Sequence, residues 1–187
     1  KNTLIENIKR DIKSVEEKLG DIDNTINSLS TKFNRLMCDS KLTNIYGAKI
    51  DEKFMPVFRE RTYNKMSSGG VRTLMSVNLY ISRLNHLMAE GGYLPTTLLL
   101  DTPGQNIGRY AREDLAENNL SDPSIYEQIY QSLKDIKSNG EHYQIIVVDN
   151  DLANCLEEDD YHLVKRFDKT EENGEKGLIN DAVISRS

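Results

Sequence analysis

The stretch "TTLLLDTPG", residues 96 to 104, decides the fold, because three leucines end at an acid and a Pro-Gly turn follows. A short apolar run bounded by turn residues is typical of a buried β-strand. A second run of this kind, "QIIVVDND" at residues 144 to 151, also ends in acids. The two runs predict two buried strands, each with carboxylates directly after its last apolar residue.

Each predicted strand follows a segment with helical spacing. Residues 71 to 89 carry apolar side chains at helical intervals and end at a Gly-Gly pair, a typical C-terminal signal. Residues 122 to 138 begin with an Asp-Pro pair that suits an N-cap and the first helical position. Helix, strand, helix, strand is the order of an α/β layer with parallel strands, where ligands bind at the carboxyl ends of the strands. We therefore expect Asp101 and Asp149 to lie at one site.

The first 36 residues show a different pattern, a heptad repeat with steps of three and four. A strict 3.5-residue period over four heptads is typical of one strand of a coiled coil. No second heptad segment follows, so we expect the partner helix to belong to another segment or another chain. A helix of a three-helix bundle is the alternative. The repeat consists of Ile5, Ile8, Ile12, Val15, Leu19, Ile22, Ile26, Leu29, Phe33 and Leu36.

Charge and composition exclude several classes of protein. The 187 residues carry a net charge of −6, with +3 on residues 1 to 66 and −9 on residues 67 to 187. The acidic part would not attract DNA by bulk charge, so any DNA contact must come from local basic surface or a partner. No apolar run is long enough to span a membrane, and two cysteines make no disulfide framework. We expect a cytoplasmic protein with no membrane partner.

Several familiar motifs do not occur in this sequence. It has no GxxxxGK[ST] phosphate loop and no GxGxxG dinucleotide fingerprint. The three histidines are not spaced as metal ligands, and we interpret each as a surface or packing residue. No Ser-His-Asp arrangement is apparent.

"SSGG" at residues 67 to 70 directly precedes the apolar helix of residues 71 to 89. Glycines let the backbone approach phosphate oxygens, and the amide groups of a helix N-terminus favour an anion. Most such stretches, taken alone, are flexible loops. Its place between a heptad segment and an acid-ended strand favours a phosphate-binding turn.

These segments, in this order, resemble the C-terminal half of an ATP-binding-cassette head of the SMC type, a family of chromosome-maintenance and DNA-repair ATPases. The resemblance implies an α/β fold, the C-terminal half of a P-loop NTPase head, with one strand of an antiparallel coiled coil at its N-terminus. It divides the chain into a coiled-coil helix at residues 1–37 and the C-terminal lobe of the head at residues 38–187. Because the phosphate loop is missing and the chain starts at Lys1, we expect a C-terminal fragment whose N-terminal lobe lies upstream.

The resemblance also assigns roles at the signature turn. Ser68, Gly69 and Gly70 match the family's Ser-Gly-Gly turn, and Arg72 stands where a basic residue is common. In the family this turn binds the γ-phosphate of a nucleotide held by the opposite head, and so acts only in a dimer. The implied cofactors are ATP and Mg²⁺.

The remaining motifs are imperfect copies of the family's. Asp101 matches the aspartate that holds the magnesium, but Thr102 stands where the family has its catalytic glutamate. Threonine cannot take a proton at neutral pH, so hydrolysis is slow, or Gln105 positions the water, or the head chiefly binds ATP. Gly108 replaces the aspartate of the D-loop, and Asn150 replaces the histidine that contacts the γ-phosphate.

The departures at these three positions resemble SMC-like subunits of bacterial antiphage defence systems such as Lamassu. This resemblance implies a second head in a homodimer, with DNA and a nuclease or another effector as further partners. A different class of function stays open, a non-enzymatic coiled-coil scaffold whose α/β domain only dimerises.

Overall fold

The computed structural model divides into two compact units, Lys1–Cys155 and Leu156–Ser187. In the second unit one 3₁₀ turn, Glu158–Asp160, is closed by reciprocal hydrogen bonds between Glu157 and Asp160. The residues that the structure describes are 2–92, 94–104, 107, 123–136, 142–150 and 152–166.

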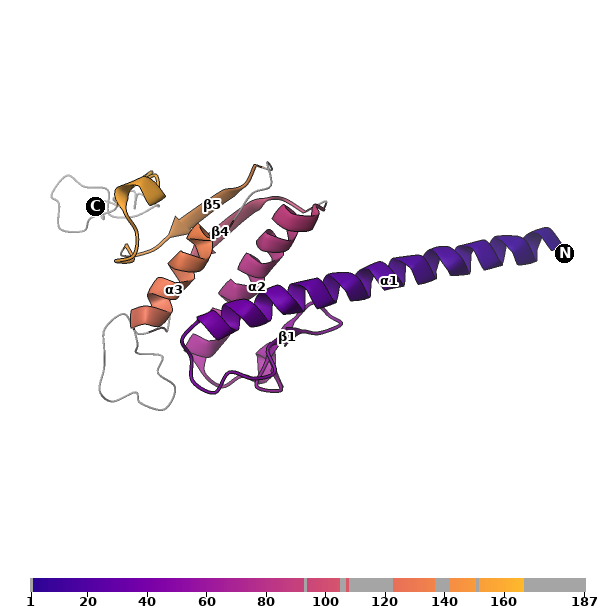
Figure 1. Cartoon of the computed structure of the whole chain (residues 1–187), viewed down its shortest axis with the longest axis horizontal. Helices are drawn as coiled ribbons and strands as arrows, with labels where there is room; N and C mark the ends of the chain where they lie inside the picture. The colour runs from indigo at the N-terminus through magenta and orange to yellow at the C-terminus, as the bar shows by residue number, and fades with distance from the viewer. Residues whose placement is uncertain are drawn as a thin grey trace, which may run out of the picture. The chain divides into compact units, whose positions relative to one another are not determined.

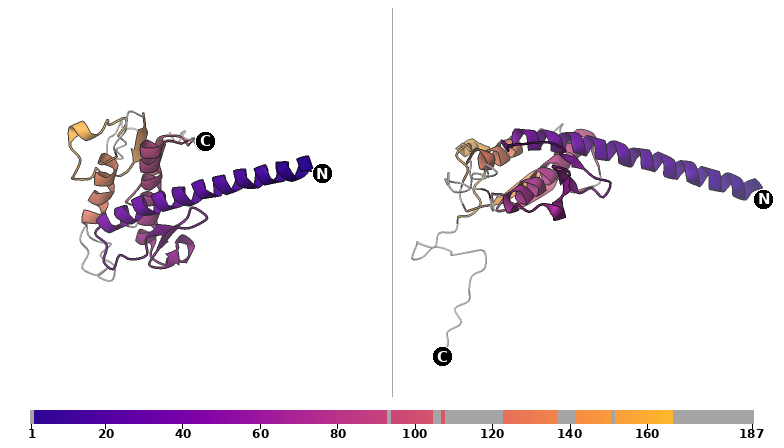
Figure 2. Two further views of the ribbon diagram at one scale, coloured as in Figure 1. Left: turned by 45° about the vertical axis from the view of Figure 1, so that its right-hand side comes forward. Right: turned by 90° about the horizontal axis from the view of Figure 1, so that it is seen from below.

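The heptad segment forms one long helix, α1 (Asn2–Asp39), which continues through Gly20 (Figure 1). Its second half is packed, and Phe33 and Met37 are fully buried. Its first half extends beyond the elements that cover the second (Figure 2). The apolar residues of the first half are exposed, namely Leu4, Ile5, Ile8, Ile12, Val15 and Ile22. The helix expected at residues 1–37 is confirmed, and half of its seam has no cover from within the described residues.

Three very short strands follow α1 and form an antiparallel sheet in the order β1, β2, β3. These strands are β1 (Lys49–Ile50), β2 (Pro56–Phe58) and β3 (Arg61–Thr62). The sheet is tied to α1 through Ser30, whose Oγ accepts the Ile50 N–H at 3.0 Å and lies 3.3 Å from the Ile50 carbonyl oxygen. All three residues of β2 are buried, so this small sheet extends the core beneath α1.

Helix α2 (Gly69–Glu90) is the central element, and a 3₁₀ turn (Tyr63–Lys65) leads into it. More than half of its residues are buried, because it contacts α1, the strand β4 and the helix α3. Even a polar side chain on its buried face is paired, since the Asn78 amide lies 3.3 Å from the Met37 sulfur of α1. The helix ends at Gly91, whose φ of 77° suits glycine.

The expected α/β layer consists of β4 (Thr97–Asp101), α3 (Pro123–Lys134) and β5 (Gln144–Val148). The two strands pair in parallel, with Leu99 opposite Ile146. Parallel neighbours need a crossover connection, and α3 lies in the connection between them. Helix α3 also contacts α2, so both helices belong to one packed layer. Asp122, the expected N-cap of α3, lies outside the described residues.

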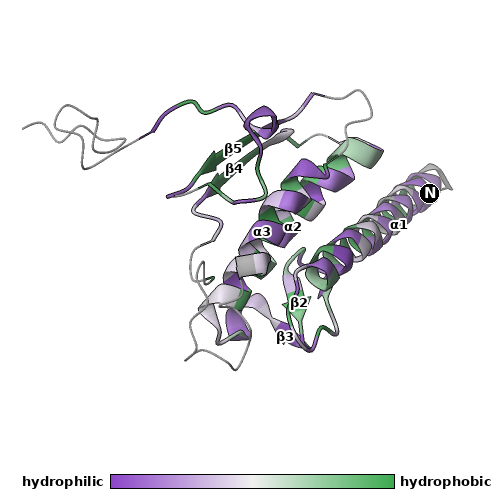
Figure 3. Cartoon of the chain, turned by 60° about the vertical axis from the view of Figure 1, so that its left-hand side comes forward, coloured by the Kyte–Doolittle hydropathy of each residue, from purple (hydrophilic) through white to green (hydrophobic). Residues whose placement is uncertain are grey.

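The sequence predicted two buried strands, but only β4 has buried residues, on one of its faces, and no residue of β5 is buried. Leu98 and Leu100 are buried, whereas Leu99 is 65% exposed. On β5, Ile146 and Val148 are 41% and 39% exposed. The apolar runs could not reveal this exposure, because a strand that is buried on both faces and a strand with one exposed apolar face have the same composition. Figure 3 shows both strands coloured as hydrophobic. We call the side of Thr97, Leu99, Asp101, Gln144, Ile146 and Val148 the open face.

None of the described helices is both long and apolar enough to cross a membrane.

The two halves of α1 are expected to differ in their contribution to stability. Replacing Phe33 by alanine removes a fully buried ring and should lower the free energy of unfolding by about 3–5 kcal/mol. The matched change Ile12→Ala, on the same seam but 52% exposed, should alter it by less than about 0.5 kcal/mol. Urea unfolding of the 187-residue chain at micromolar concentration measures both. Equal losses for the two variants would contradict the description of α1.

Candidate functional site

The carboxyl ends of β4 and β5 form one edge, because the strands are parallel and in register. Asp101 is the register partner of Val148, so Asp149 follows at the neighbouring position. The expectation that the two acid-ended strands meet is confirmed. Asp101 alternates with buried Leu100 and lies on the open face. Asp151 lies outside the described residues.

Thr102 holds this edge in a constrained backbone conformation. Its N–H donates to the Val148 carbonyl oxygen at 2.7 Å, which extends the ladder beyond Asp101. Its φ is 51°, a left-handed value that a β-branched residue adopts only when its surroundings impose it. The Thr102 hydroxyl donates to Asp101 Oδ1 at 2.8 Å. A carboxylate has about four lone-pair positions, so Asp101 can accept this bond and still bind a hydrated cation.

The turn after Thr102 is packed into the protein. Pro103 and Gly104 are buried, and the Ile107 N–H donates to the Gly104 carbonyl oxygen at 3.0 Å. Ile107 itself is buried and anchors the turn. Gln105 and Gly108, the other residues singled out here, lie outside the described residues.

Two tyrosines that the sequence did not single out converge on the end of β5. The hydroxyls of Tyr126 and Tyr130, one turn apart on α3, donate to the same oxygen, Asp149 Oδ2, at 2.8 and 2.7 Å. Burial and the neighbouring Tyr126 and Asp149 raise the pKa of Tyr130 above its usual range, so its hydroxyl stays a donor. A pair of tyrosines at i and i+4 on an apolar helix was the only signal available.

Asn150 is exposed and is held through its backbone. Its N–H donates to Asp149 Oδ1 at 2.7 Å. Asp149 therefore bonds to α3 with one oxygen and to the turn after β5 with the other. This places Asp149 in a structural role at the strand end.

The SSGG turn opens α2. Ser68 is the N-cap, and its Oγ accepts the Val71 N–H at 3.4 Å, a weak cap. Gly69 and Gly70 are the first helical residues, and Gly70 is buried. The guanidinium of exposed Arg72 lies over the Tyr63 ring, 5.0 Å from its centroid.

The structure brings Asp101, Thr102 and Asn150 to one edge, but it does not join the SSGG turn to them. The contacts described for Ser68 and Arg72 involve no residue of the β4–β5 edge.

Within the described residues, no three His, Cys, Asp or Glu side chains gather as a metal site. Asp101 is the residue that could take part in holding a cation at the β4 edge. A Mg²⁺ ion keeps several waters and is often held by only one or two carboxylates together with substrate phosphates. One carboxylate from this chain fits that pattern of ligation.

A second polar cluster joins α1 to α2. Glu90 Oε1 accepts from the Ser28 hydroxyl and from Lys32 Nζ at 2.9 Å, and it lies 3.2 Å from His86 Nδ1. Ser28 Oγ is 3.1 Å from the same ring nitrogen. A nucleophilic relay needs serine and carboxylate on opposite nitrogens of the imidazole. This cluster is therefore a clamp between two helices, and His86 is a packing histidine as expected.

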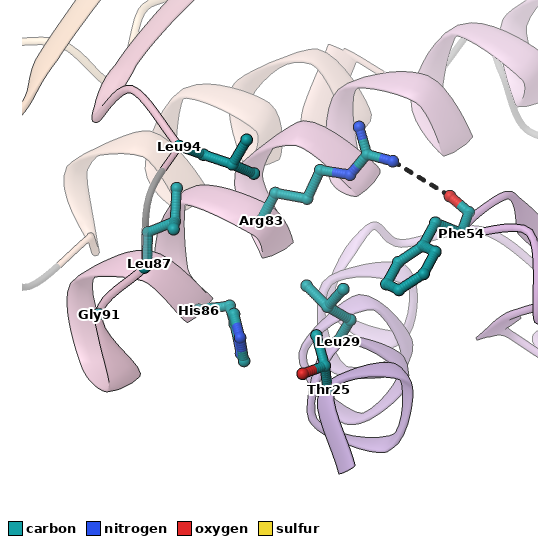
Figure 4. A pocket seen from close by; sticks show the side chains of 9 residues that line it. Thr25, Leu29, Phe54, Arg83, His86, Leu87, Gly91 and Leu94 are labelled. Carbon is teal, nitrogen blue, oxygen red and sulfur yellow. Dashed lines mark hydrogen bonds between the residues drawn. The ribbon is translucent and has the colours of Figure 1, made fainter. Parts of the chain in front are cut away.

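The clamp borders an open cavity of about 480 Å³ between α1, α2 and the loop before β2 (Figure 4). Leu29, Phe54, Leu87 and Leu94 make its lining largely apolar. Arg83, which also lines it, donates to the Phe54 carbonyl oxygen at 3.2 Å.

No protein-family model matches the sequence, and no curated protein matches it at a significant level. The site must be interpreted from its own residues.

The clamp predicts a pH dependence of stability. Hydrogen bonds from Ser28 and Lys32 lower the pKa of Glu90 from 4.5 to about 2. A lowered pKa in the folded state stabilises the protein above pH 4.5, and this contribution is lost as pH falls toward 2. Glu90 is half exposed, so solvent screening limits its contribution to about 1 kcal/mol.

Glu90→Gln should therefore lower the free energy of unfolding at pH 7, and its difference from the wild type should narrow between pH 4.5 and pH 2. Urea unfolding at several pH values measures this difference. Glu16→Gln, an exposed change on α1, is the control and should show none. A Glu90→Gln difference that stays constant with pH would contradict the lowered pKa.

Proposed function

We propose that this chain is the C-terminal lobe of the ATP-binding head of an SMC-like, DNA-associated ATPase. One observation carries the proposal. A parallel strand pair ends in Asp101, and the face that bears this carboxylate is apolar and exposed, although Leu98 and Leu100 on the other face of β4 are buried.

Parallel sheets are found almost only where both faces are covered. Here Leu99 and Ile146 lie side by side on the open face. Each strand has only the other as its neighbour among the described residues, so their outer edges can pair with further strands. A second lobe that adds strands and covers this face would bury these groups. We propose that this lobe is the N-terminal half of the head and brings the phosphate loop to Asp101.

The exposed half of α1 supports the same proposal. Its apolar seam runs at heptad spacing from Ile5 to Ile22, and every side chain of the seam whose burial is described is exposed there. An antiparallel coiled-coil partner, emerging from the same N-terminal half, would cover it. The N-terminal half of the head, with its coiled-coil helix, would then cover both exposed apolar surfaces.

In this proposal ATP-Mg²⁺ binds between the lobes, with Asp101 holding the ion through water. Ser68, Gly69, Gly70 and Arg72 face a nucleotide carried by a second head, which fits the observation that none of their described contacts involves the edge that bears Asp101. Each half-site is incomplete alone, so ATP closes a head-to-head dimer. Closure moves the coiled coils, which hold DNA, and in a defence system it activates a nuclease or another effector.

The rival is a scaffold whose open face and helix only dimerise. Both of its surfaces are apolar, as a dimer interface requires. It predicts an ATP-independent dimer and no nucleotide binding.

The full-length protein that contains these residues should bind ATP-Mg²⁺ and dimerise only with it. Ligand at 100 times its Kd stabilises a protein by about 2.7 kcal/mol, which a thermal shift detects. Asp101→Asn should remove most of the shift because the ion loses its carboxylate. Ser68→Arg should keep the shift but abolish the dimer, since the turn acts on the opposite head's nucleotide.

Ala89→Arg adds the same charge at the exposed end of α2 and is the control for Ser68→Arg. Absence of both the thermal shift and an ATP-dependent dimer in the wild type would overturn the proposed function and favour the scaffold.

A substitution of Thr102 tests whether this residue limits the rate of ATP hydrolysis. Thr102→Glu places a general base where the family has one and should raise ATP hydrolysis by at least about tenfold, because such a base contributes 10²–10⁴-fold. Glutamate is not β-branched, so it tolerates the φ of 51° at least as well as threonine does. Phosphate release under saturating ATP measures the rate. A wild-type rate of ATP hydrolysis that Thr102→Glu does not raise and Gln105→Ala lowers would instead show that Gln105 positions the attacking water.

A further inference from the structure

We propose that Tyr126 and Tyr130 are positioning residues, which hold Asn150 through Asp149. The function of Asn150 in contacting the γ-phosphate rests on the proposed function. The hydrogen-bonded chain that fixes it does not, because every bond in it lies within this chain.

The first step is at the tyrosine hydroxyls. Both rings are almost fully buried and pack edge to face, with centroids 5.2 Å apart. Each phenol has one proton, and each hydroxyl lies within 2.8 Å of the same carboxylate oxygen. Their mutual contact of 3.3 Å is longer, so both protons are best placed on Asp149. Bonds to an ionised acceptor are about twice as strong as neutral ones.

The second step is at Asp149. Packing of α3 alone would need only the rings, and phenylalanine would supply them. The two hydroxyls therefore serve to fix the Asp149 carboxylate. Its other oxygen accepts the Asn150 N–H at 2.7 Å. The hydrogen bonds that begin at the two buried tyrosines thus end on the backbone N–H of an exposed residue.

The third step is the place of this turn. Asp149 follows Val148, the register partner of Asp101, so Asn150 stands near the end of β4. Sites that bind a ligand need side chains fixed by a supporting shell of hydrogen bonds. Helix α3 supplies this shell and also contacts α2, the helix that begins at the SSGG turn. A shift of α3 would therefore reach both the β5 edge and α2.

The test is the double variant Tyr126→Phe/Tyr130→Phe in the full-length chain, because it keeps both rings and removes both hydroxyls. We expect hydrogen exchange of the Asn150 amide, measured by NMR without nucleotide, to become at least about tenfold faster. In the Asp149→Asn background the same double change should have little further effect, since the carboxylate that it acts through is gone. If the double variant folds poorly, Tyr126→Phe alone should show a smaller effect in the same direction.

Tyr143→Phe is the matched control. It also removes one tyrosine hydroxyl bond, to the Ile136 carbonyl oxygen at 3.1 Å, but just before the amino end of β5. Asn150 exchange should keep its wild-type rate in this variant. An unchanged rate in the double variant, or an equal increase in Tyr143→Phe, would overturn the proposal.

A second measurement separates this proposal from the proposed function. If the wild type binds ATP-Mg²⁺, the double variant should bind it about tenfold more weakly, and adding Asn150→Ala should weaken it little more. Equal affinity of the double variant and the wild type would overturn the positioning role and leave the proposed function standing. A wild type that does not bind ATP would overturn the proposed function, whereas the exchange measurement would still decide whether the tyrosines hold Asn150.

Discussion

A parallel strand pair has two faces to bury, and among the described residues of β4 and β5 only Leu98 and Leu100, on one face of β4, are buried. Helix α2 packs against Leu98 and Leu100, and the opposite face, with Leu99, is open. The carboxylate of Asp101 belongs to that open face because side chains alternate along a strand. Whatever covers the sheet must therefore meet the acid as well. The acid and the exposed leucine belong to the same side of β4.

The long helix repeats this division in another form. One heptad seam runs through α1, yet Phe33 is fully buried and Ile12 is exposed. Hydrophobic spacing specifies which side of a helix is apolar, and it does not say how far along the helix a partner extends. The helix and its seam could therefore be predicted from the sequence, but only the structure shows where the packing of α1 against α2 ends. The clamp of Ser28, His86 and Glu90 then fixes α1 to α2.

Much of the layer order was readable from apolar spacing and turn residues, and α2, β4, α3 and β5 lie where these patterns predicted. Although Asp101 lies on the open face and Asp149 bonds to α3 instead, the parallel pairing of the two acid-ended strands was also predictable. The roles of Tyr126 and Tyr130 were not. Their bonds to Asp149 span about twenty residues and depend on how α3 lies against β5. Local sequence patterns carry no information on contacts between residues so far apart in the chain. Burial of the strands was wrongly predicted because it also depends on such contacts.

The residue where the proposed function would place catalysis is also one of six described non-glycine residues with a positive φ. Thr102 combines a φ of 51°, a ladder bond to Val148 and a hydroxyl bond to Asp101. A β-branched residue in this conformation costs on the order of 1–3 kcal/mol, which the surrounding bonds must offset. Glycine or asparagine would avoid much of that cost, but neither would offer a hydroxyl to Asp101. The hydroxyl restrains the carboxylate and cannot act as a base. These contacts fit a role for Thr102 in ordering the Asp101 carboxylate.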